Sequence, residues 1–136
     1  MEGHLIDLLY VSRSRLTLAQ GTDQIADIVR VSLERNAALG VTGALVWTGE
    51  AFAQILEGPD AALEVLMASI ARDERHETLS VLRRGAIQHR RFAGWALAYA
   101  GGASFIAGLV EPLLAPSVIA SDPAVDKLIR ALHAFA

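Results

Sequence analysis

The side chains best suited to chemistry are polar groups that the sequence places in apolar surroundings. Gln54 alternates with Phe52 and Leu56 in a short apolar segment, so its amide should point into an apolar layer. A buried amide without hydrogen bonds costs about 1 to 3 kcal/mol, so the protein or a ligand must satisfy it. Tyr10 lies near the end of another apolar segment, and Asn36 lies in the last turns of a predicted helix. Taken singly, these residues have ordinary interpretations: an amide bonded to backbone, an aromatic core residue and a solvated or capping residue.

The common sequence signatures of catalysis and metal binding are absent from the chain. It has no Cys, which excludes disulfides, a thiolate nucleophile and cysteine metal sites. It also lacks the G-x-S-x-G elbow, the P-loop and the G-x-G-x-x-G fingerprint. We expect no metal site, because the four histidines share no metal-ligand spacing: His4, His76, His89 and His133.

Length and charge indicate one globular domain that does not bind nucleic acid. The chain has 136 residues and a formal net charge of −3, and its twelve cations are eleven Arg and Lys127. This leaves no broad basic face for a phosphate backbone. The only basic cluster is either solvated charge at strand ends or an attractor for an acidic partner: Arg83, Arg84, Arg90 and Arg91.

The first residues and the hydropathy pattern indicate a cytoplasmic protein without a membrane segment. The start, MEGHLIDLL, carries Glu2 and Asp7 and has no basic region. No run approaches about 18 uninterrupted apolar residues, so we expect no contact with a membrane.

The hydrophobic pattern predicts an α+β fold in which helices and strands alternate. Strands are predicted over 4–12, 41–47, 51–57 and 79–84, and in a short segment with Trp95, Leu97 and Tyr99. Helices are predicted over 22–39, with Thr22 as N-cap and Gly40 at its end, over 60–72 and over 123–135. The order βαββαββ suits a ferredoxin-like mixed five-stranded sheet with helices packed against it.

One face of the first predicted helix changes character along its length. Ile25, Val29, Ser32 and Asn36 recur at helical spacing, so a stripe that begins apolar continues with two polar side chains. This stripe should face something that is partly polar.

Five segments, in their order and spacing, resemble the BLUF domain (blue light sensing using FAD). They are LLYVSRS at 8–14, RNAALGVTGAL at 35–45, FAQILEGP at 52–59, RDERH at 72–76 and RRFAGW at 90–95. The resemblance covers about residues 5–99. It implies a photosensory domain over 1–101, with two helices on the flavin side of the sheet, and a helical extension over 102–136 that packs on the opposite face.

The resemblance also implies the cofactor and its contacts. A flavin would bind without a covalent bond between the first two helices, FAD being expected and FMN and riboflavin being the alternatives. The flavin-facing stripe would then be Ile25, Val29, Ser32 and Asn36. Arg35 stands where many members have Asn or His, and Arg75 and His76 lie toward the dinucleotide end, where Arg can bind phosphate.

The photochemistry that the resemblance implies centres on Tyr10 and Gln54. Tyr10 would supply an electron and a proton after blue-light excitation, and Gln54 would change its hydrogen bonds by rotation, tautomerism or both. The product is a red-shifted state that reverts in the dark, so the domain is a switch and not an enzyme. Trp95 would either compete with Gln54 or serve as an alternative donor, or else anchor the sheet. Leu97 stands where Met is common, at the output step.

We expect the signal to reach a separate signalling protein or to pass across a homo-oligomer. The alternatives are a flavin-free ferredoxin-like interaction module and a small hydrolase of acylphosphatase type, for which Arg13 and Arg15 would have to form a phosphate loop. Neither alternative predicts a yellow purified protein.

Overall fold

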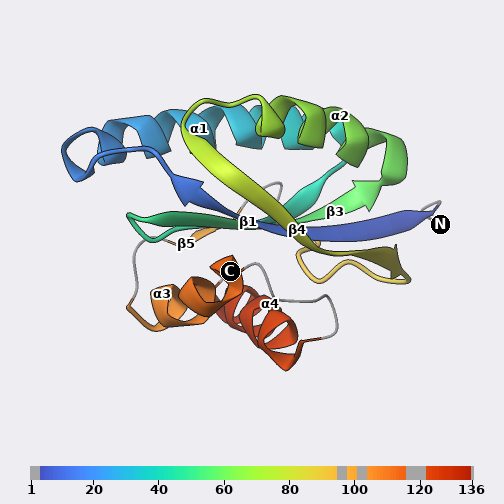
Figure 1. The fold of residues 1–136 in the computed structure, drawn as a ribbon. Helices are drawn as coiled ribbons and strands as arrows, with labels where there is room; N and C mark the ends of the chain where they lie inside the picture. The colour runs from blue at the N-terminus through green and yellow to red at the C-terminus, as the bar shows by residue number, and fades with distance from the viewer. Residues whose placement is uncertain (1–3, 95–97, 101–103, 116–121, 136) are drawn as a thin grey trace.

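The computed structural model describes residues 4–94, 98–100, 104–115 and 122–135, and these form a central sheet with helices on both faces (Figure 1). Helices α1 and α2 cover one face, and α3 and α4 cover the other. The elements follow the chain as β1 (Leu5–Ser14), α1 (Leu18–Leu39), β2 (Thr42–Trp47), β3 (Ala51–Pro59), α2 (Asp60–Ala71), β4 (His76–Ile87), β5 (Ala98–Ala100), α3 (Ser104–Val110), the 3-10 helix η1 (Glu111–Leu114) and α4 (Pro123–Phe135).

The sheet has the strand order β4-β1-β3-β2-β5. Strand β1 is antiparallel to both β3 and β4, β2 is antiparallel to β3, and β5 is parallel to β2. This arrangement confirms the predicted α+β, ferredoxin-like class. The register places Tyr10 of β1 directly opposite Gln54 of β3.

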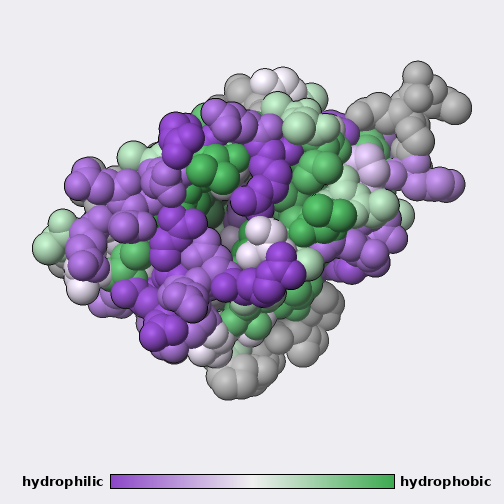
Figure 2. All heavy atoms as spheres, turned by 90° about the horizontal axis from the view of Figure 1, so that it is seen from above, coloured by the Kyte–Doolittle hydropathy of each residue, from purple (hydrophilic) through white to green (hydrophobic). Residues whose placement is uncertain are grey.

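The two central strands are buried on both faces, and for this reason they appear in the sequence as nearly continuous apolar runs. Leu9 and Val11 of β1 belong to the large core beneath the sheet, together with Ile106, Leu128 and other residues of the C-terminal helices. Leu8 and Tyr10 face the opposite way, toward α2. Seen from the side of α1 and α2, the surface is hydrophilic over much of its area, with hydrophobic atoms set between the polar side chains (Figure 2).

Helix α1 begins four residues earlier than predicted. Its N-cap is Thr17, whose Oγ1 accepts a hydrogen bond from the Gln20 N–H at 3.3 Å, so Thr22 lies inside the helix. Gly21, which favours a loop in the sequence, is required by packing: a Cβ there would lie 2.1 Å from Cη2 of Trp47. The predicted end is confirmed, because Gly40 adopts a left-handed conformation with φ 69°.

Strand β4 extends well beyond the predicted 79–84. It pairs with β1 along its length through two register shifts, and Thr78 beside one of them has φ 53°. The strand lies at the edge of the sheet, so most of its side chains are exposed or half-buried and the apolar pattern covers only its middle.

The arginines of the predicted basic cluster join separate elements, while Arg84 and Arg91 remain exposed, so the attraction of an acidic partner stays a prediction. Arg83 contacts Asp7 and Asp126, whereas Arg84 pairs with Asp60. Arg90 donates to the carbonyls of Glu57 and Gly40.

Among the described helices none is long and apolar enough to cross a membrane.

Candidate functional site

A cleft lies between α1 and α2 on the sheet face that carries Tyr10 and Gln54. It contains about 550 Å³ of space, part of it open to solvent. Strands β1, β2 and β3 form its floor, the two helices form its sides and the start of β4 closes one end. The described residues that line it are Tyr10, Ile28, Val31, Ser32, Arg35, Leu45, Phe52, Gln54, Ser69, Ile70, Asp73, Arg75 and His76.

Tyr10 and Gln54 form a buried hydrogen-bonded pair on the floor of this cleft. The Tyr10 hydroxyl donates to Oε1 of Gln54 at 2.6 Å, and the two residues are 3% and 4% exposed. Burial, with a smaller contribution from the nearby Asp73 carboxylate, raises the pKa of Tyr10 well above its ordinary value. Among the described residues the amide nitrogen of Gln54 has no hydrogen-bond partner, so it has two N–H donors for a ligand in the cleft.

His76 forms part of the wall beside this pair. Its Nε2 lies 2.6 Å from the Ile70 carbonyl, which can only accept, so Nε2 carries the proton. Its Nδ1 lies 2.7 Å from the hydroxyl of Ser12. The ring meets those of Tyr10 and Phe52 edge-on, with centroids 6.2 and 5.9 Å apart. Both ring nitrogens therefore bond within the protein, and the dinucleotide contact expected of His76 stays a prediction.

The face of α1 that lines the cleft is displaced from the predicted stripe. Ser32 and Arg35 do line it, but the apolar positions there are Ile28 and Val31. Ile25 and Val29 do not line it, although they belong with Ile28 to one apolar cluster that also includes Leu45, Phe52 and Trp47. The cleft-lining positions of α1 are therefore shifted along the helix relative to the predicted stripe, with Ser32 common to both.

Asn36 is buried near the end of α1, outside the residues that line the cleft. Its backbone carbonyl accepts from the N–H of Val41 at 2.8 Å, where the helix turns into the next strand. Flavin contacts of Ile25, Val29 and Asn36 stay predictions.

Two polar bridges join the sides of the cleft. Arg35 of α1 donates to the Ser69 hydroxyl of α2 at 2.8 Å. At the other end, Arg75 binds Asp73 through Nε and Nη2, at 2.9 and 2.7 Å, and reaches Asp27 of α1 at 3.3 Å. Asp27 and Arg35 are eight residues apart, which is about 12 Å along a helix. The hydrogen bond from Arg75 lowers the pKa of Asp73, so that carboxylate stays ionised.

Several cleft residues were not singled out from the sequence. Asp73 is the most informative of them, because it belongs to the segment RDERH and holds Arg75 in place. Ile28, Val31 and Ser69 carried no signal in the sequence, because only the packing of α1 beside α2 brings them to the cleft. Trp95 and Leu97 lie outside the described residues.

The composition of the cleft fits a flat heterocycle with a hydrogen-bonding edge. Leu45, Phe52 and Ile70 offer apolar surface for the faces of a ring system, while the Gln54 amide and the Ser32 hydroxyl offer donors and acceptors. A flavin has both features. Among the described residues no group of three or more His, Asp or Glu could hold a metal ion.

Comparison with known proteins gives a consistent family match. The family model described as "BLUF: Sensors of blue-light using FAD" matches residues 5–98. The photoactivated adenylate cyclase subunit alpha of Euglena gracilis is 35% identical over 94 residues, which is 69% of this chain and 9% of that protein. The blue light- and temperature-regulated antirepressor BluF of Escherichia coli is 32% identical over 65% of this chain and 21% of that protein. The chain thus spans about a tenth of the length of the cyclase subunits that it matches.

Solved structures match over nearly the whole chain. The dark-state structure of BlrB, a BLUF protein, is 32% identical, covers 98% of both chains and has a TM-score of 0.80. The ground state of BlsA gives the same TM-score at 22% identity, which supports the fold alone. The family model therefore describes residues 5–98 as a blue-light sensor.

Proposed function

Because the chain belongs to the BLUF family of flavin-based blue-light sensors, we propose that its α1/α2 cleft holds FAD and that Tyr10 and Gln54 are its photoactive pair. One observation carries the proposal: the 2.6 Å bond from the Tyr10 hydroxyl to the Gln54 amide, buried on the cleft floor. This bond uses the oxygen of the amide and leaves its nitrogen for the ligand.

Residues of this chain support a flavin with a phosphate-containing tail. Ile28, Leu45 and Phe52 would contact the ring system, and Ser32 would bond its polar edge. Arg75 lies at one end of the cleft, and its guanidinium still has N–H groups beyond those that bind Asp73 and Asp27. A phosphate group of FAD or FMN would accept from these remaining N–H groups and share the guanidinium with the Asp73 and Asp27 carboxylates, whereas riboflavin would not use it.

The light reaction divides between the two residues of the pair. A bound flavin supplies blue-light absorption and, once excited, an electron acceptor. Tyr10 gives up an electron and its phenolic proton, which Oε1 of Gln54 is placed to receive, and Tyr10 regains both when the charges recombine. During this cycle the amide rotates or tautomerises, so that its donor and acceptor ends change places toward the cleft. The result is a reversible red-shifted state with no net oxidation of the protein.

We propose that residues 1–101 sense light and that residues 102–136 pass the change on. Helices α3 and α4 pack beneath the sheet, against the backs of the strands that form the cleft floor. The recipient would be a separate signalling protein in the cytoplasm or a second copy of the chain. Trp95 and Leu97 precede β5 and would contribute to this step.

The test is an absorption spectrum of the purified, flavin-loaded protein before and after a blue flash, followed through dark recovery. We expect a reversible red shift of the flavin band in the wild type and its loss in Gln54→Leu and in Tyr10→Phe. The matched control is Gln24→Leu, the same replacement at an exposed position of α1, which should keep the shift.

The outcomes separate the proposal from its alternative. A flavin that binds without any shift would contradict the photoreceptor. Failure to bind FAD even after reconstitution would favour a flavin-free interaction module. A shift that persists in Gln54→Leu would contradict the assigned pair.

A further inference from the structure

Glu57 is a buried carboxylate on the photoactive strand that the light reaction does not use. It lies three residues beyond Gln54 in β3 and has no exposed surface. Successive side chains of a strand alternate between faces, so Glu57 points away from the cleft, to the side of Ile55 and the C-terminal helices. A buried carboxylate is tolerated only with a full set of donors, so its partners indicate its role.

The partners of Glu57 belong mainly to the segment that follows β4. Its Oε2 accepts from the backbone N–H of Arg91 at 2.7 Å, and its Oε1 accepts from that of Phe92 at 3.0 Å. The third donor is the hydroxyl of Thr42, also at 3.0 Å, from the neighbouring strand β2. One side chain of β3 therefore holds two consecutive peptide groups of this segment.

Arg90 reinforces the same junction from the other direction. Its guanidinium donates to the carbonyl of Glu57 at 3.1 Å, to the hydroxyl of Thr42 at 2.9 Å and to the carbonyl of Gly40 at 2.8 Å. Gly40 is the C-cap of α1, the helix that lines the cleft. Residues 90–92 are thus fixed to β3, to β2 and to the end of α1.

Phe92 connects this junction to the C-terminal helices. Its side chain is fully buried in the core beneath the sheet, which includes Leu128, Ile129 and Leu132 of α4. Its ring meets that of His133 of α4 edge-on, with centroids 5.7 Å apart. In Figure 1 the segment after β4 runs beneath the sheet, on the side of α4.

We propose that Glu57 is a positioning residue that couples the strand carrying Gln54 to helix α4 through residues 90–92. The proposal rests on the light reaction proposed above. A change in the hydrogen bonds of Gln54 shifts β3 locally, and Glu57 transmits the shift because its carboxylate is bonded to the backbone that places Phe92 on α4. Glu57 is absent from the cleft lining, so it does not affect light absorption itself.

The informative substitution is Glu57→Gln, because it keeps the shape of the side chain and changes its acceptors. A carboxylate accepts through both oxygens, whereas the amide presents an NH₂ group where one backbone N–H needs an acceptor. One of the bonds to Arg91 and Phe92 is then lost. Glu50→Gln, at an exposed position just before β3, is the matched control for the change in charge.

The experiment measures two quantities on the full flavin-loaded chain: the red shift after a blue flash, and the light-minus-dark difference in amide hydrogen exchange over residues 123–135. In the wild type and in Glu50→Gln we expect both. In Glu57→Gln we expect an unchanged red shift and at least a fivefold smaller exchange difference. Phe92→Leu, which keeps the backbone bonds to Glu57 but removes the ring from His133, should give the same loss and serves if Glu57→Gln does not fold.

A wild-type exchange difference that persists at full size in these variants would overturn the coupling and leave the light reaction intact. A wild type that shifts its spectrum without any change over residues 123–135 would overturn it as well. A wild type with no red shift would overturn the light reaction first, and the coupling with it.

Discussion

The Tyr10 hydroxyl is held in its neutral form before any light reaction takes place. The side chain is buried, and both burial and the Asp73 carboxylate disfavour a phenolate, so its pKa lies well above the ordinary value of about 10. A neutral phenol at 2.6 Å from an amide oxygen can move its proton over a short distance without rearranging its neighbours. Because of the same burial, the free energy of unfolding should depend on pH in the range where a free Tyr ionises.

Stability should fall at high pH because of Tyr10. Below about pH 10 the phenol is neutral in both states, so its contribution is constant. Above that pH the unfolded chain loses the proton that the folded chain retains, and stability falls by up to about 1.4 kcal/mol per pH unit. We expect urea unfolding at pH 8 and pH 11 to show a loss about 1.4 kcal/mol larger in the wild type than in Tyr10→Phe. Tyr99 ionises in the unfolded chain of both proteins, so an equal loss in both would contradict the buried neutral phenol.

The backbone conformation of Thr78 should also have a measurable effect on the free energy of unfolding. Its φ of 53° lies in the left-handed region, which a β-branched residue rarely adopts, beside a register shift of β4. We expect Thr78→Gly to raise the free energy of unfolding by about 0.5 to 1 kcal/mol, because relief of this strain exceeds the added chain entropy. Ser80→Gly, two residues away at another exposed position of the strand, should lower it by a similar amount. Destabilisation by both substitutions would show that Thr78 is not strained.

At the scale of whole elements, the strands buried on both faces were the most predictable. The central strands β1 and β3 appear as short apolar runs, and two residues that stand out in them, Tyr10 and Gln54, proved to be paired. Sequence periodicity was less informative where packing decides the outcome. Position 21 is glycine within a helix because Trp47 leaves no room for a Cβ there, and Ile28 lines the cleft because α2 lies beside α1. Both features depend on contacts with residues that are distant in the sequence, so local patterns do not predict them.

The end of α1 offers a direct test of how glycine acts in two kinds of element. A Cβ added at Gly40 or at Gly108 would meet no described atom within 4 Å, so packing does not distinguish the two positions. Gly40 is a left-handed C-cap, and Gly40→Ala should cost about 1 kcal/mol of stability. Gly108 lies within α3, where Gly108→Ala should add about 0.5 to 1 kcal/mol. Thermal unfolding of both variants should therefore show shifts of opposite sign, and shifts of the same sign would contradict this assignment.

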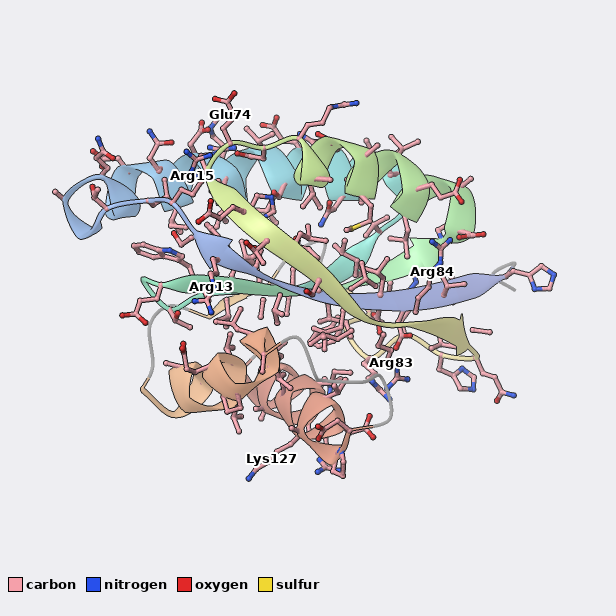
Figure 3. The ribbon with its side chains drawn as sticks, viewed as in Figure 1. Arg13, Arg15, Glu74, Arg83, Arg84 and Lys127 are labelled. Carbon is pink, nitrogen blue, oxygen red and sulfur yellow. The ribbon has the colours of Figure 1, made fainter. Side chains whose placement is uncertain are left out.

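At the scale of the molecule, β4 joins the two helical layers through neighbouring residues. Arg84 lies on the side of α2 and pairs with Asp60, while Arg83 lies on the side of α4 (Figure 3). Arg83 contacts Asp126 of α4 at 3.0 Å and the buried Asp7 of β1 at 3.3 Å. The edge strand β4, whose sequence is largely polar, thus connects three layers: helices α1 and α2, the sheet, and helices α3 and α4.

The two ion pairs of Arg83, with Asp126 and with Asp7, should differ greatly in their contribution to the free energy of unfolding. Asp126 is 61% exposed, so Asp126→Asn should cost less than about 1 kcal/mol. Asp7 is 1% exposed, and among the described residues its oxygens have no hydrogen-bond partner and one other cation, Arg91, at 3.9 Å. Arg83→Met therefore leaves a buried carboxylate poorly compensated, and it should lower the free energy of unfolding by about 3 kcal/mol.

The decisive comparison is the double variant Arg83→Met with Asp7→Asn, measured by urea unfolding beside the single variants. Removing the carboxylate together with its cation removes the buried charge, so the double variant should recover at least half of the loss seen in Arg83→Met. If the double variant were as unstable as the sum of the singles, Arg83 would stabilise the molecule by packing its stem beneath the sheet and not by compensating Asp7. In that case apolar contacts alone would hold α3 and α4 against the sheet, and Asp126→Asn would leave the position of α4 on the sheet unchanged.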